Sequence, residues 1–260
     1  MSAAALEVVD LCKTFGGLRA VDSVSFNVPS GSLTALIGPN GAGKTTVFNL
    51  ITNFFRPDTG EVRYFGASLT GLEPGRIAAL GLVRTFQSAR IFPGMTTLEI
   101  ALVGAHLQVR AGPLRQMFWS GQSRREERAL IRRAEALLEL VGLSAERQVP
   151  ATELPMGAQK LLEVVRALMA RPRLLLLDEP AAGLNDSETA ELAALLRAVR
   201  ANNITVAVVE HNMSLVMGVA DQVVVLDAGK LLASGTPAQM QSDARVIEAY
   251  IGQDEGAADA

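Results

Sequence analysis

Nine residues from Gly38 to Thr46, GPNGAGKTT, have the composition and spacing of a loop that binds phosphate groups. They match the pattern G-x-x-x-x-G-K-[ST], with an apolar run before them and a helical pattern after them. Glycines let backbone N–H groups point inward and surround phosphate oxygens at the start of a helix. Lys44 adds a positive charge for the outer phosphates, and Thr45 offers a hydroxyl to Mg²⁺. A plain glycine turn would leave the lysine unexplained. The predicted nucleotide site is Gly38, Pro39, Asn40, Gly41, Ala42, Gly43, Lys44, Thr45 and Thr46.

Two adjacent acids, Asp178 and Glu179, follow the apolar run of leucines at 174–177. A buried strand that ends in Asp178 can bring this carboxylate beside the phosphate loop, where it would assist Mg²⁺. Glu179 leaves the strand in another direction and can polarise a water for in-line attack on a γ-phosphate. The alternative is a pair of solvated acids, which would be favoured if the chain had no phosphate loop.

The sequence around these groups predicts strands that alternate with helices. LTALIG before the loop, RLLLLD before the acids and ITVAVVEH further on are apolar enough for strands covered on both faces. KTTVFNLITNFF follows the loop with a helical pattern, and LEVVDLCKTF and AVDSVSFNV predict strands near the N-terminus. QVVVLDAGKLLASG predicts a hairpin around Ala228 and Gly229. We expect an α/β fold: a P-loop core with a mostly parallel sheet, an N-terminal antiparallel β part and an inserted helical lobe.

The sequence pattern changes between Met95 and Pro150, where apolar residues recur at spacings of three or four, as in an amphipathic helix. We therefore expect an ATP-binding core from 1–94 and 171–252, a helical lobe at 95–170 and a disordered tail at 253–260. Seven arginines lie between 110 and 133. Their simplest interpretation is a solvated helix face, and a contact with a partner or with lipid headgroups is the minority interpretation.

Composition limits the class of protein. The 260 residues carry a net charge of −3, which lacks the broad basic field of a nucleic-acid binder, so no nucleic acid is expected as a partner. The single cysteine, Cys12, cannot form an internal disulfide, and this fits a reducing compartment. The sequence has neither a signal peptide nor the roughly 18 continuous apolar residues of a membrane helix. Any membrane link is therefore expected to run through a partner.

With the phosphate loop and the acids in this order, the chain resembles the ATP-binding subunits of ABC transporters over nearly its whole length. The resemblance implies the ABC ATPase fold, with ATP and Mg²⁺ as cofactors. It places Phe15 against adenine and Val21 among the nucleotide contacts. It identifies Gln87 in VRTFQ as the Q-loop glutamine, near the metal, and His211 in VVEH as the switch histidine, which contacts the γ-phosphate.

The segment LPMGAQK falls where the family has its signature loop, usually L-S-G-G-Q, which caps the ATP held by the opposite subunit. Leu154, Gly157 and Gln159 remain recognisable, whereas Pro155 and Met156 replace the serine and the first glycine. Asn185 stands where the D-loop usually ends in aspartate. The predicted loop that acts on the other subunit is Leu154, Pro155, Met156, Gly157, Ala158 and Gln159. A second, heterologous ABC ATPase is expected as the partner that completes the sites.

LDEPAAGLN, VRTFQ and the terminal VIEAYIG resemble the ATPases of branched-chain amino acid importers. This implies transmembrane permease subunits as partners, an indirect substrate-binding protein, and a cytoplasmic position on the inner face of the cell membrane. Importers of amides or urea, and non-transport ABC ATPases acting on DNA, remain alternatives, the latter disfavoured by the acidity. A P-loop kinase would leave Gln87, His211 and the signature segment unexplained.

Overall fold

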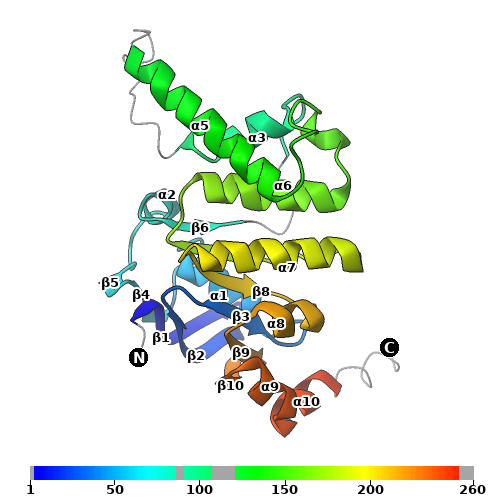
Figure 1. Ribbon diagram of the computed structural model, residues 1–260. Coiled ribbons are helices and arrows are strands. Elements are labelled where there is room, and N and C mark those ends of the chain that lie inside the picture. The colour runs from blue at the N-terminus through cyan, green and yellow to red at the C-terminus, as the bar shows by residue number, and fades with distance from the viewer. Residues whose placement is uncertain (1–2, 86–90, 107–120, 252–260) are drawn as a thin grey trace.

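The computed structural model describes residues 3–85, 91–106 and 121–251 of the chain (Figure 1). Within these ranges no helix is both long enough and apolar enough to cross a bilayer. The described strands are β1 Ala4–Phe15, β2 Leu18–Pro29, β3 Leu33–Ile37, β4 Thr59–Tyr64, β5 Ala67–Ser68, β6 Leu82–Arg84, β7 Leu174–Asp178, β8 Thr205–Val209, β9 Gln222–Asp227 and β10 Lys230–Gly235. The described helices are α1 Lys44–Ile51, α2 Pro74–Ala79, α3 Thr97–Val103, α5 Gly121–Leu140, the 3-10 helix η2 Ala151–Glu153, α6 Met156–Met169, α7 Asp186–Ala201, α8 Met213–Val219, α9 Pro237–Ser242 and α10 Ala244–Ile251.

The strands form two sheets. The first is antiparallel, in the order β2-β1-β4-β5, and the second runs in the order β10-β9-β3-β8-β7-β6. Within the second sheet β9, β3, β8, β7 and β6 are parallel, and β10 pairs antiparallel with β9. The expected α/β class with a mostly parallel sheet and an N-terminal antiparallel part is confirmed.

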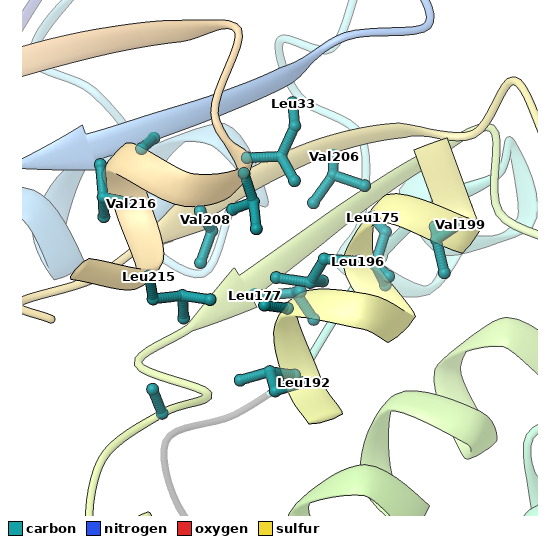
Figure 2. Close-up of a cluster of buried hydrophobic side chains, with 14 of the residues drawn as sticks. Leu33, Leu175, Leu177, Leu192, Leu196, Val199, Val206, Val208, Leu215 and Val216 are labelled. Carbon is teal, nitrogen blue, oxygen red and sulfur yellow. The ribbon is translucent and has the colours of Figure 1, made fainter. Parts of the chain in front are cut away.

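Strand β7 is covered on both faces, as its leucine run predicts. Leu174 and Leu176 pack in a core shared with β1, β2 and α1, whereas Leu175 and Leu177 point into the core beneath α7 and α8 (Figure 2). All four leucines are 0% exposed. Burying a leucine contributes about 1.5–3 kcal/mol, so the strand that ends in Asp178 is held firmly from both sides.

Helix α1 is shorter than its sequence pattern predicts. It ends at Ile51, although the helical pattern extends to Phe55. Asn53 stops it, because this residue takes a left-handed conformation with φ 54°. Its side-chain amide donates to the carbonyls of Leu69 and Leu72, which hold the turn in place.

Helices α3, α5 and α6 share a third core, and α5 projects from the upper part of the molecule (Figure 1). Ile100, Ala134, Leu138 and Val165 are among its buried members. These helices lie inside the expected lobe at 95–170, whose boundaries stay a prediction. Of the seven arginines at 110–133, Arg110 and Arg115 lie outside the described residues. Exposed arginines on α5 are Arg124, Arg125, Arg128 and Arg132.

A close backbone contact joins α3 to α6 inside this third core. A Cβ atom added to Gly104, the residue after α3, would lie 1.8 Å from the carbonyl oxygen of Arg166. Gly104 itself has an ordinary helical backbone conformation, so the glycine is required by the close approach and not by its φ angle.

We predict that Gly104→Ala forces α3 away from α6 and lowers the free energy of unfolding by about 1–3 kcal/mol, the usual cost of overpacking a core. Gly75→Ala is the matched control, because Gly75 lies in α2 with no atom within 4 Å of an added Cβ. Urea unfolding of the two variants and the wild type measures the effect. Equal stability of the two variants would show that the contact is unimportant.

Candidate functional site

The phosphate loop connects β3 to α1 and needs glycine at two positions for lack of space. Gly38 has φ 151° and an added Cβ would lie 2.1 Å from Leu226 O. Gly43 has φ 94° and an added Cβ would lie 2.5 Å from Ala20 O. The glycine pattern seen in the sequence therefore corresponds to close packing of the loop against β2 and β9.

Lys44 begins α1 and is almost fully buried, with 5% exposed. Its ammonium group donates to the carbonyl oxygens of Gly38 and Pro39, each at 2.8 Å. Burial lowers the pKa of Lys44, while the charges of Glu179 and Asp178 act in the opposite direction. The ammonium group is thus folded back onto its own loop, close enough to Glu179 and Asp178 for their charges to act on it. Thr45, the next residue, is exposed.

The two acids follow β7 as the sequence predicts, and the structure gives them different surroundings. Asp178 is 3% exposed and pairs in register with Val209 of the parallel strand β8. Glu179 has a left-handed backbone, φ 50°, and donates its N–H to Val209 O at 2.9 Å. A non-glycine residue in this conformation costs about 1–3 kcal/mol. The left-handed conformation turns the chain at Glu179 out of the strand direction.

His211 lies beside Glu179, at the end of the next strand. His211 Nε2 is 3.1 Å from Glu179 Oε1, and the two side chains are 40% and 17% exposed. Sequence reasoning predicted a role for each residue, and the structure brings the two together at the carboxyl edge of the sheet. An imidazole N–H at this distance can donate to the carboxylate and orient it.

Glu210 is a buried residue of this site that sequence reasoning missed. It is 2% exposed, and its carboxylate accepts N–H groups from Ala181 at 2.6 Å, His211 at 3.0 Å and Asn212 at 3.2 Å. These bonds tie the segment after Glu179 to the segment that carries His211. An acid at the end of an apolar strand was the available signal, but the partner that joins it to the segment after Glu179, the N–H of Ala181, is distant in sequence.

A magnesium ion fits the groups at this edge. Asp178 Oδ1 is buried and has no hydrogen-bond partner among the described residues, so one carboxylate oxygen is left for a cation. No group of three or more His, Cys, Asp or Glu side chains that could hold a metal occurs in the described part of the chain. Mg²⁺ does not require one, since it is usually held by one or two carboxylates together with substrate phosphates. Gln87, the third predicted metal residue, lies outside the described residues.

The two nucleotide contacts expected outside the phosphate loop, Phe15 and Val21, differ in accessibility. Phe15, at the end of β1, is 40% exposed and packs edge-to-face against Phe55 with ring centroids 5.2 Å apart. An exposed ring is available for stacking. Val21 is 0% exposed and belongs to the core beneath β1 and β2. Its side chain therefore supports β2, and any nucleotide contact would come from the strand it positions.

The signature segment starts α6 and contacts the D-loop helix α7 of the same chain. Pro155 is the N-cap of α6, with neither an N–H nor a side-chain oxygen to offer, and Met156 is 62% exposed. Gly157 is buried against Glu188, whose carboxylate oxygen would lie 2.3 Å from an added Cβ. The segment therefore has an exposed front and a back closed by α7.

Gln159 and Asn185 both have structural roles in the chain. Counted from Leu154, the fifth position of L-S-G-G-Q is Ala158, so Gln159 lies one position too late to be that glutamine. Gln159 instead donates its amide to Leu154 O at 2.8 Å and closes the turn. Asn185 is the N-cap of α7 and forms a capping box with Glu188.

Comparison with known proteins agrees with this arrangement. The family model described as ABC transporter matches residues 21–182, and the model described as branched-chain amino acid ATP-binding cassette transporter matches residues 230–256. The high-affinity branched-chain amino acid transport ATP-binding protein BraF of Pseudomonas aeruginosa is 44% identical over 97% of this chain and 100% of its own length. The LivG protein of Escherichia coli K12, whose name is otherwise the same, is 42% identical over 97% of this chain and 100% of its own length.

Solved structures show the same fold. A nucleotide-free ATP-binding cassette from an ABC transporter has a TM-score of 0.82 at 33% identity, covering 95% of this chain and 98% of that one. The ADP conformation of such a cassette has a TM-score of 0.82 at 32% identity, covering 96% and 99%. The predicted resemblance is thus confirmed over nearly the whole chain, and this chain belongs to the ABC transporter family as an ATP-binding cassette.

Proposed function

We propose that this chain is the ATP-hydrolysing subunit of an importer for branched-chain amino acids. The observation that carries the chemistry is the apposition of Glu179 Oε1 and His211 Nε2, 3.1 Å apart, at the sheet edge that also bears Lys44. The substrate class rests on the names of the full-length relatives and on the matched C-terminal segment. The permease subunits and a substrate-binding protein complete the importer, and the chain works on the inner face of the membrane.

Each group has a part in hydrolysis. Lys44 leaves its two loop carbonyls for the β- and γ-phosphates when ATP enters, because a charged acceptor forms the stronger hydrogen bond. Glu179 accepts a proton from the attacking water, and His211 holds this carboxylate and then contacts the γ-phosphate. Thr45, Asp178 and Gln87 would hold Mg²⁺, which supplies charge neutralisation on the phosphates when bound.

ATP also acts as a clamp between two ATPases. The exposed front of the signature segment covers the nucleotide held by the opposite subunit, and hydrolysis reopens the pair. The helices at 95–170 pass this motion to the permease.

Lys44→Ala should abolish ATP turnover and weaken nucleotide binding while the fold stays intact. The ammonium group is the phosphate-binding cation of the loop, and no other change is made at the sheet edge. ATPase rates and the affinity for a fluorescent ATP analogue measure the two effects. Lys230→Ala is the control, because the side chain of Lys230 is 67% exposed and forms a surface ion pair with Asp22. Wild-type turnover in Lys44→Ala would contradict the assignment.

Glu179→Gln should bind ATP normally but lower turnover by at least about 100-fold, the lower end of a general base's contribution. The ATP-bound pair should then accumulate, and size-exclusion chromatography with ATP should show a stable dimer. Glu139→Gln, an exposed change on α5, should behave as wild type. Undiminished turnover in Glu179→Gln would move the base to another group, with His211 the next candidate.

We further propose that the partner ATPase is a different chain with an intact signature loop. Pro155 lacks both the hydroxyl and the backbone N–H that a serine would offer to the opposite γ-phosphate, while Gly157 and the first turn of α6 remain. A hydrogen bond to a charged group contributes about 1.5–3 kcal/mol, which corresponds to roughly 10–100-fold in the affinity of closure. The two ATP sites should therefore be unequal, with the stronger one on this chain's phosphate loop.

The catalytic glutamate is mutated in each ATPase of the purified complex separately. We expect the larger loss of turnover from Glu179→Gln in this chain. Equal losses, or a transporter with two copies of this chain and no sister, would refute the proposal.

A further inference from the structure

Arg84, the last residue of β6, reaches across to the acid at the end of β7. Its Nη2 lies 2.7 Å from Asp178 Oδ2, and the two side chains are only 6% and 2% exposed. A buried carboxylate is costly unless it is paired and hydrogen-bonded. Arg84 therefore supplies a charged, hydrogen-bonded partner for Asp178 in the interior.

The other guanidinium nitrogen holds the phosphate-loop helix. Nη1 donates to Asn49 Oδ1 at 2.7 Å and lies 3.3 Å from the hydroxyl of Thr52, the C-cap of α1. The guanidinium carbon also lies 5.7 Å from the ring centroid of Phe48 and 5.9 Å from that of Phe54. One side chain thus joins β6 to α1, the helix that follows the phosphate loop, and to β7, the strand that ends in Asp178.

The pairing with Asp178 uses one carboxylate oxygen. Arginine often binds a carboxylate through both oxygens at once, whereas here Oδ1 has no hydrogen-bond partner among the described residues. Nη1 donates to Asn49 of α1, and the hydrogen bond to Asp178 runs from Nη2 to Oδ2. This pairing occupies Oδ2 and leaves Oδ1 as the oxygen available to a cation.

We propose that Arg84 is the positioning residue of the magnesium site: it fixes Asp178 relative to the phosphate-loop helix so that Oδ1 faces the ion held with the ATP phosphates. The inference rests on the proposed role of Asp178. Arginine is required because a lysine ammonium is a single point charge and cannot hold Asp178 and Asn49 in the fixed fork of a guanidinium.

The test is the effect of Mg²⁺ on nucleotide affinity. The dissociation constant of a fluorescent ATP analogue is measured for the full chain with Mg²⁺ and with EDTA. The quantity compared between variants is the constant in EDTA divided by the constant in Mg²⁺. Arg84→Met keeps the packing against Phe48 and Phe54 but removes the fork, and should lower this ratio about tenfold, the equivalent of about 1.4 kcal/mol. Arg84→Lys keeps the charge and should give an intermediate ratio, with the binding in EDTA nearly unchanged.

Arg173→Met is the matched control. Arg173 precedes β7 at its other end and stacks on Phe65, 3.7 Å from the ring centroid, so the same substitution there should leave the ratio at the wild-type value. Thermal unfolding of every variant records whether it is folded. If Arg84→Met does not fold, the ratio in Arg84→Lys tests the proposal, since in that variant the buried carboxylate of Asp178 still has a cation beside it.

Asp178→Asn separates the two ideas. A wild-type ratio in Asp178→Asn would overturn the metal role of Asp178 itself. A reduced ratio in Asp178→Asn together with wild-type ratios in the folded Arg84 variants would overturn the role of Arg84 alone. A lower melting temperature of Arg84→Met with an unchanged ratio would likewise reduce the residue to a structural ion pair.

Discussion

The site depends on keeping negative charge at the buried end of a strand. Strand β7 is covered by apolar side chains on both faces, which makes it rigid but places Asp178 and the backbone of Glu179 where water is scarce. Two cationic side chains lie beside this end of the strand. Arg84 pairs with Asp178, and Lys160 Nζ lies 3.4 Å from the carbonyl oxygen of Glu179. Burial lowers the pKa of Lys160, opposed by Glu210, Glu163 and Glu179. The acids are thus held by charge and the strand by apolar contacts.

The segments that carry the proposed site residues are also connected to one another by hydrogen bonds and close contacts. Glu210 links the segment after Glu179 to the segment bearing His211, and Glu188 links the D-loop helix to Gly157 of the signature segment. These hydrogen bonds and close contacts connect the segments directly. In the proposed pair of ATPases they would link the sheet edge at Glu179 and His211 to the signature segment of the same chain.

Local patterns in the sequence predicted the parts of the site that are set by local rules. The phosphate loop needs glycine because its backbone passes close to Ala20 and Leu226, and a buried leucine run can only be a central strand or a buried helix. The end of α1 was missed because Asn53 depends on carbonyls near residue 70. Arg84 was missed because Asp178 and Asn49 are far from it in sequence, and Glu210 because it binds the distant N–H of Ala181. The position of Gln159 can be counted from Leu154 in the sequence, and the structure adds its bond to Leu154 O.

The central claim is that Lys44, Glu179 and His211 form one ATP-hydrolysing site at the carboxyl edge of the sheet. A crystal structure of the Glu179→Gln variant with ATP and Mg²⁺ tests it most directly. The account predicts that Lys44 Nζ leaves the carbonyls of Gly38 and Pro39 and contacts the γ-phosphate, with residue 179 and His211 on the far side of that phosphate. A nucleotide bound elsewhere, with the Lys44 ammonium still on its loop carbonyls, would contradict the account.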